Sequence, residues 1–146
     1  MAATRHDWRA LRAVLALAAT LCYAGQLAAQ DPRASLVQET ARAWLAHTDR
    51  DDAAASWNDA GKLFRNAITV ERWAQSLNQV RPPLGTVSQR ALLKTQFRKS
   101  FPGAPDGEYA VVVFRTTFAK KANAGETVTL EHEPDGAWRV IGYLVQ

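Results

Sequence analysis

The spacing of apolar residues changes from a helical period to an alternating one along this chain. From residue 31 to residue 81, apolar residues recur every three or four positions, which predicts helices. After Gly85 apolar and polar residues alternate, as is typical of strands. Helices followed by strands indicate an α+β fold, with the helices packed on one face of an antiparallel sheet.

The first predicted helix opens at Asp31-Pro32, because aspartate accepts hydrogen bonds from free N–H groups and proline fits the first helical turn. It ends near Thr48-Asp49. Its predicted inner face consists of Val37, Ala41, Trp44, Leu45 and Thr48.

Two more helices are predicted, which makes three in all. The second begins at a cap formed by Asp51 or Asp52, and Gly61 is a stop signal for it. Residues 62–67 are expected to extend it as one further helical turn. Thr69 caps the third, and Pro82-Pro83 prevents its continuation. The residues expected to face inward are Ala54, Trp57, Ala60, Leu63, Phe64, Val70, Trp73, Ala74 and Leu77.

Four strands are predicted to form an antiparallel meander. The first is a long strand after Gly85 with Val87, Ala91, Leu93 and Phe97 near one face, and the others are residues 109–118, 127–132 and 138–145. Turn residues place the connections at 102–107, 123–125 and 134–136.

The strands carry apolar residues on both faces, although the exposed face of a lone sheet is usually polar. In the second strand, Val112, Phe114 and Phe118 alternate with Val111 and Val113. In the last strand, Trp138, Val140 and Leu144 alternate with Ile141, Tyr143 and Val145. We therefore predict that the second face is partly covered, by a second copy of the chain or by its own strand ends and tail.

The first 29 residues have the order of a secretory signal peptide: Arg5, Arg9 and Arg12, an apolar stretch of 12 residues (13–24), and a small-residue segment (27–29). Cleavage is expected after position 29, or alternatively after position 24. The apolar stretch is shorter than the roughly 20 residues of a membrane-spanning helix. A buried first helix is the alternative interpretation.

Cleavage would leave one domain, residues 30–146, exported to the periplasm or secreted, with no transmembrane segment. A lipid anchor on Cys22 is the less favoured alternative, because Leu21 stands where a lipoprotein signal has a small residue. The formal net charge of +4 falls to about +2, since three arginines and one aspartate leave. The remaining charges are interspersed, which argues against nucleic acid as a partner.

Cys22 is also the only cysteine. The remaining domain is therefore expected to have no disulfide, cysteine-bound zinc or thiol nucleophile. It has no zinc-binding H-E-x-x-H, phosphate-binding loop, nucleophile elbow or dinucleotide fingerprint. We accordingly predict no catalytic residues, no metal site and no cofactor. His47 and His132 are expected at the surface and at the sheet rim.

Several segments carry a family resemblance: AAASW (53–57), ERWAQ (71–75), PLG (83–85), PGAPDGEYAVVVFRTTFAKK (102–121) and ETVTLEHEPDGAWRVIGY (126–143). Together they resemble the bacterial family called domain of unknown function 4019. The resemblance implies a small exported α+β protein and supplies no catalytic residues. The architecture also looks like the cone of the nuclear-transport-factor-2 (cystatin-like) superfamily, which encloses a pocket and hosts both enzymes and binding modules.

A pocket between helices and sheet would have eight candidate residues: Trp57, Asp59, Trp73, Arg90, Tyr109, Arg115, Glu126 and Tyr143. The tryptophans, with Trp44, are expected to line a pocket or to fill the core. Glu126 is expected to pair with Arg90 or Arg115 across neighbouring strands.

The leading functional hypothesis is a non-catalytic binding or assembly module for a small hydrophobic ligand or a peptide. One alternative is a small cone-fold enzyme, of an isomerase or lyase type, which would use Asp59 or Glu126 with Tyr109 or Tyr143 for acid–base catalysis. The other is a structural envelope protein that dimerises through its sheet face.

Overall fold

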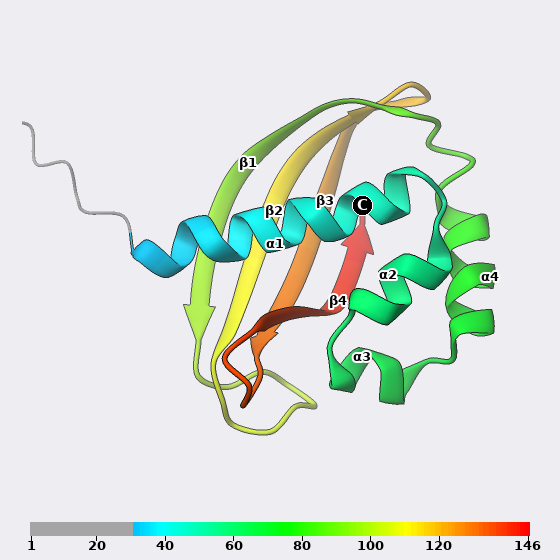
Figure 1. Ribbon diagram of the computed structural model, residues 1–146. Helices are drawn as coiled ribbons and strands as arrows, with labels where there is room; N and C mark the ends of the chain where they lie inside the picture. The colour runs from blue at the N-terminus through cyan, green and yellow to red at the C-terminus, as the bar shows by residue number, and fades with distance from the viewer. Residues whose placement is uncertain (1–30) are drawn as a thin grey trace, which may run out of the picture. The chain divides into compact units, whose positions relative to one another are not determined.

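The computed structural model describes residues 31–146 (Figure 1). The predicted signal peptide lies outside these residues. The elements are α1 (Pro32–Asp49), α2 (Ala53–Asp59), α3 (Lys62–Ala67), α4 (Val70–Val80), β1 (Val87–Arg98), β2 (Tyr109–Phe118), β3 (Lys121–His132) and β4 (Trp138–Val145). The predicted α+β class is confirmed. No helix within residues 31–146 has both the length and the apolar character needed to cross a membrane.

The prediction of three helices is wrong, because residues 62–67 form a separate helix rather than a continuation of α2. Ala60 and Gly61 have extended backbone conformations that break the chain between the two helices. The N–H of Gly61 donates to the carbonyl of Val140 at 2.8 Å. A Cβ at Gly61 would lie 3.0 Å from Cγ2 of Ile141. Close approach to β4 therefore explains both the break and the glycine.

The predicted helix starts are confirmed. Asp31, Asp52 and Thr69 each accept a hydrogen bond from a backbone N–H in the first turn of α1, α2 and α4. All five predicted inner residues of α1 are buried. The prediction for Ala54 is wrong, because this residue is exposed and α2 instead buries Ser56 against Trp44 and Trp73.

The four strands form one open antiparallel sheet in the order β1-β2-β3-β4, as the meander prediction requires. The predicted bounds of β2 and β4 agree with the structure. The third strand begins at Lys121 rather than Thr127, so residues 123–125 belong to β3. The turn before it lies at residues 119–120, whose N–H groups donate to the carbonyls of Thr86 and Leu84.

Irregularities in the ladder change which face some side chains occupy. The pairing is interrupted at Ser88 and Leu93 in β1, between Thr116 and Phe118 in β2, and at Ile141 in β4. Ala91, predicted to share a face with Val87, is exposed. Because an extra residue reverses the alternation that follows it, Leu93 does not share a buried face with Phe97. For the same reason Tyr143 lies on the helix side and Leu144 is 50% exposed, which corrects the predicted alternation of β4.

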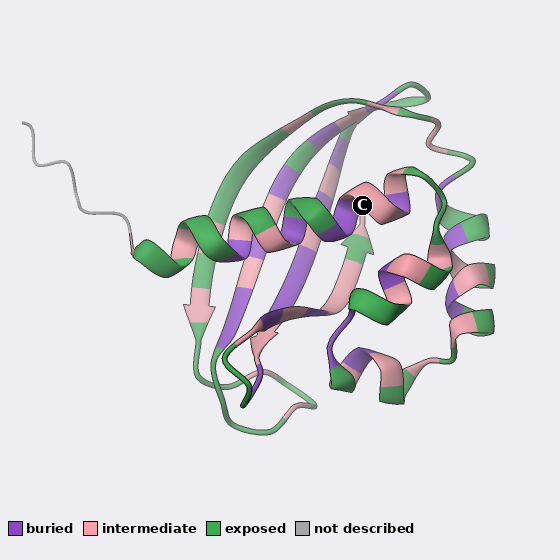
Figure 2. Cartoon of the chain, in the orientation of Figure 1, coloured by how far each residue is buried: buried purple, intermediate pink, exposed green. Residues whose placement is uncertain are grey.

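The core lies between the helices and one face of the sheet, which α1 crosses (Figures 1 and 2). In β2, Val112, Phe114 and Phe118 are buried as predicted. Aromatic rings from α1, α3, α4 and β4 meet at one end, with Phe64 and Trp73 at 5.1 Å between ring centroids. This packing connects the helix layer to the sheet edge and leaves a cavity beside it.

Candidate functional site

Arg90 and Glu126 meet in a buried polar network on the helix side of the sheet. Glu126 in β3 has no exposed surface, and its carboxylate accepts a 2.7 Å hydrogen bond from Nε of Arg90 in β1. The hydroxyl of Tyr143 in β4 donates to it at 2.7 Å, and the hydroxyl of Thr116 in β2 also donates to it. Of the two predicted partners of Glu126, the structure therefore selects Arg90.

A second carboxylate and a second guanidinium complete the network. Asp49, at the end of α1, accepts from Nη1 of Arg90 at 2.8 Å and from Nη2 of Arg81 at 2.7 Å. Arg81, which follows α4, also lies 3.4 Å from Glu126. Two anions and two cations thus hold the ends of α1 and α4 onto the sheet, and their charges compensate one another.

The surroundings of the network raise the pKa values of two of its members, Arg90 and Tyr143. Burial opposes the charge of Arg90, but hydrogen bonds to Asp49 and Glu126 outweigh it and raise the pKa of Arg90. Burial, followed by the negative charge of Glu126, raises the pKa of Tyr143 well above its ordinary value. Tyr143 therefore remains a proton donor to Glu126, whose carboxylate is fully engaged.

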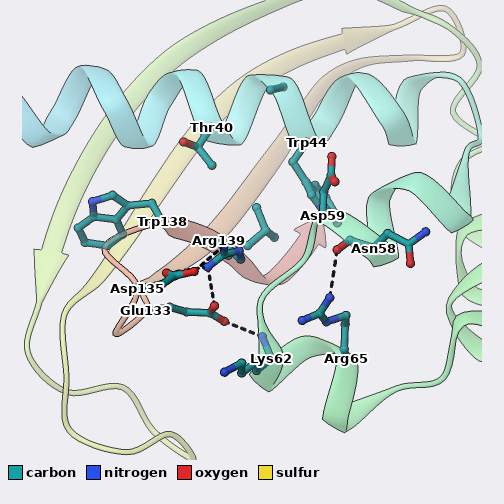
Figure 3. Close-up of a pocket in the computed structure, with 12 residues that line it drawn as sticks. Thr40, Trp44, Asn58, Asp59, Lys62, Arg65, Glu133, Asp135, Trp138 and Arg139 are labelled. Atoms are coloured by element: carbon teal, nitrogen blue, oxygen red, sulfur yellow. Dashed lines mark hydrogen bonds and ion pairs between the residues drawn. The ribbon is translucent and has the colours of Figure 1, made fainter.

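A cavity of about 530 Å³ lies elsewhere, between α1, the α2–α3 junction and the β3–β4 hairpin (Figure 3). Its charged lining residues are Asp59, Lys62, Arg65, Glu133, Asp135 and Arg139. The remaining lining residues are Thr40, Ala43, Trp44, Asn58, Trp138 and Val140. Among the eight predicted pocket residues, only Asp59 lines this cavity.

The hairpin wall of the cavity is held by ion pairs, as Figure 3 shows. Nη1 of Arg139 donates to Glu133 at 2.6 Å, and Nη2 of Arg139 lies 2.8 Å from Asp135. The other oxygen of Glu133 accepts the backbone N–H of Lys62 at 2.7 Å. Glu133 is buried and so links the hairpin to the start of α3. Both hairpin carboxylates are thus committed to protein partners.

Asp59, away from the hairpin wall, forms a hydrogen bond with His47, which does not itself line the cavity. A nitrogen of Arg50 donates to Nδ1 of His47 at 3.0 Å, which makes Nδ1 an acceptor. Nε2 of His47 therefore carries the proton and donates to Asp59, whose oxygen lies 2.7 Å away. The Asp59 side chain is 63% exposed, and the residue lines the cavity.

Residues 40–143 match the family described as "Protein of unknown function (DUF4019)". The chain belongs to the DUF4019 family. The matched range begins at Thr40 and ends at Tyr143, so it contains every residue of the cavity lining and of the buried network. No curated protein and no solved structure matches the chain.

The other predicted pocket residues of this DUF4019 domain lie in the core, bond to the backbone or are exposed, and none of them lines the cavity. Trp73 is buried, and its Nε1 donates to Ser56 at 2.8 Å. Trp57 is half-buried and donates to the carbonyl of Ile68. Tyr109 is buried at the start of β2, where its hydroxyl donates to the carbonyl of Pro105, and Arg115 is exposed. The structure does not bring these residues to a common site.

Most of the charged residues that line the cavity were not predicted from the sequence. One signal was available: the Pro-Asp-Gly turn at 134–136 joins adjacent strands, which brings Glu133 and Arg139 near each other. For the buried network, no local pattern indicates that Asp49 and Arg81 take part, because in the sequence they are only the residues at the ends of two helices. Within the part of the chain that the structure describes, no group of three or more His, Cys, Asp or Glu side chains is arranged to hold a metal ion.

Asp135 gives the hairpin of this DUF4019 domain a predictable dependence on pH. The hydrogen bond from Arg139, and then the backbone N–H of Ala137, lower the pKa of Asp135 to about 2, from 3.8. Because the folded pKa is depressed, its stabilising contribution is present above about pH 4 and is lost as the pH falls towards 2. The difference in unfolding free energy between the wild type and Asp135→Asn should therefore shrink over this range. Urea denaturation at several pH values measures it, and a constant difference would contradict the assignment.

Proposed function

We propose that this protein is a non-catalytic binding module whose ligand occupies the cavity between α1, α3 and the β3–β4 hairpin. The cavity itself carries the proposal, since about 530 Å³ lies within the roughly 300–1,000 Å³ of small-molecule sites. Its walls combine hydrogen-bonding and charged groups with the surfaces of Ala43, Trp44 and Val140. The ligand is therefore polar on part of its surface, unlike the hydrophobic ligand expected from the sequence.

The arrangement of carboxylates and tyrosines favours binding over catalysis. The enzyme hypothesis needs a carboxylate in a pocket with a tyrosine within hydrogen-bond reach. The hydroxyl of Tyr143 lies within hydrogen-bond reach of Glu126, at 2.7 Å. However, Glu126 is buried and already paired with two arginines. Asp59 lines the cavity but bonds to His47, and Tyr109 bonds to Pro105. A substrate in the cavity would meet no carboxylate–tyrosine pair.

A fragment screen by NMR tests the proposal. Fragments that bind are expected to shift the backbone amide signals of α3 and of residues 133–140. Ala43→Trp fills the cavity from α1 and should abolish these shifts. Ala54→Trp is the matched control, because Ala54 is an exposed helical alanine that does not line the cavity. Shifts confined to other surfaces, or shifts that Ala43→Trp leaves intact, would refute the proposal.

Export to the periplasm or beyond, and the cone architecture, remain part of this proposal. Dimerisation through the sheet face remains the alternative for assembly, and two residues of β2 provide positions at which to test it. Val111 and Val113 are half-buried on β2 and alternate with its buried residues. If this face joins two copies, Val113→Glu should convert a dimer to a monomer in sedimentation velocity without changing the circular dichroism spectrum.

A further inference from the structure

The charged groups of the cavity differ in how far protein partners already engage them. Glu133 and Asp135 both pair with Arg139, and Glu133 also accepts the N–H of Lys62. These contacts orient the two carboxylates, and the guanidinium of Arg139 is occupied by its ion pairs with both of them. The remaining charged groups are Asp59, with one oxygen bonded to His47, and the side chains of Lys62 and Arg65.

Lys62 and Arg65 are the cations best able to receive a ligand. They lie three residues apart on α3, which places them on the same side of the helix. Within residues 31–146, the ammonium of Lys62 forms no ion pair within 4.0 Å, although its charge helps to lower the pKa of Asp135. Arg65 uses one N–H on the carbonyl of Asn58 at 3.2 Å, which leaves its other donors open.

We propose that the cavity binds a small organic anion, whose carboxylate or phosphate contacts Lys62 and Arg65. This inference rests on the proposed function and specifies the ligand class. Lys62 and Arg65, three residues apart on α3, supply the charge and the several N–H donors that an anionic oxygen group needs. The rest of the ligand packs toward Ala43 of α1 and Val140 of β4, which also line the cavity. Asp59, farther along the cavity, disfavours a ligand with a second anionic group near α1.

Titration of the full-length protein with three matched probes tests this inference: benzoate, phenyl phosphate and the neutral benzamide. Amide shifts of α3 and residues 133–140 give the affinities. At least one anion should bind about tenfold more tightly than benzamide. Added salt should lower the affinity for this anion and leave the affinity for benzamide unchanged. The stronger of the two anions distinguishes a carboxylate from a phosphate ligand.

Variants identify the groups responsible. Lys62→Gln and Arg65→Gln should each weaken the anion about three- to tenfold, as expected for partly exposed ion pairs, and the double variant should bind anion and amide equally. Lys94→Gln, an exposed lysine on β1 away from the cavity, should change nothing. The inference would be overturned if the wild type bound the anions and benzamide with equal affinity, or bound neither anion. It would also be overturned if the double variant still preferred the anion to benzamide. Neutral fragments that still bind in the cavity would show that the proposed function stands without it.

Discussion

Glu126→Gln should lower the free energy of unfolding by about 3–5 kcal/mol, the cost of removing one partner from a buried ion pair. The carboxylate has no exposed surface and pairs with Arg90 at 2.7 Å and Arg81 at 3.4 Å. Without it, Asp49 alone would face two guanidinium groups in the interior. The glutamine amide would also direct N–H donors toward groups that are themselves donors.

Glu131→Gln is the matched control, because it makes the same substitution on the same strand. Burial, followed by the nearby charge of Glu133, raises the pKa of Glu131. Its charge is therefore unfavourable in the folded state, and neutralising it should leave stability unchanged or slightly increased. Guanidinium denaturation followed by circular dichroism measures both variants. A loss below about 1 kcal/mol for Glu126→Gln, within the range of ordinary surface substitutions, would show that the network contributes little.

Trp73→Ala is expected to cost a similar amount, about 3–5 kcal/mol, because it removes a large buried side chain and leaves a void. Trp73 is 7% exposed, and its ring lies 5.1 Å from Phe64 and 5.9 Å from Trp44 between centroids. The indole N–H also donates to Ser56. The structure thus assigns this residue to the core rather than to the ligand cavity.

Trp73→Phe separates the packing of the ring from its hydrogen bond. Phenylalanine retains most ring contacts but cannot donate to Ser56, so this variant should lose only about 1–2 kcal/mol. Denaturation curves for the two variants measure the difference directly. If Trp73→Ala were as stable as the wild type, while fragment binding in the cavity was lost, Trp73 would be a ligand contact instead.

The inner face of α1 and the bounds of two strands were predictable because each depends on local spacing. The inner face of α1 follows from five residues at helical intervals, and all five are buried. The bounds of β2 and β4 follow from alternation between clear turn residues, including the Pro-Asp-Gly turn at 134–136. The caps at Asp31, Asp52 and Thr69 use side chains that bond to the adjacent backbone.

The remaining features depend on contacts between distant parts of the chain. Pairing with β2 draws residues 121–126 into β3, although Asn, Ala and Gly favour a connection. The irregularities at Leu93 and Ile141 appear only when strands are paired. Separation of α2 from α3 requires the approach of Gly61 to Val140, which no local pattern indicates.

The candidate site was predictable only in part for the same reason. Sequence spacing indicated that Glu126 pairs across the sheet, and Arg90 proves to be its partner there. It gave no indication that Asp49 and Arg81, separated by 32 residues, would complete that network. The cavity is assembled from α1, the α2–α3 junction and the β3–β4 hairpin, so its charged lining became visible only in the folded chain.

Native mass spectrometry of the protein isolated from the cells that make it tests the central claim most directly. The wild type should carry a small molecule as a discrete added mass. Ala54→Trp should retain this added mass, and Ala43→Trp, which fills the cavity, should lose it. A wild type without added mass, or an added mass that Ala43→Trp retains, would contradict the assignment of the cavity as the binding site.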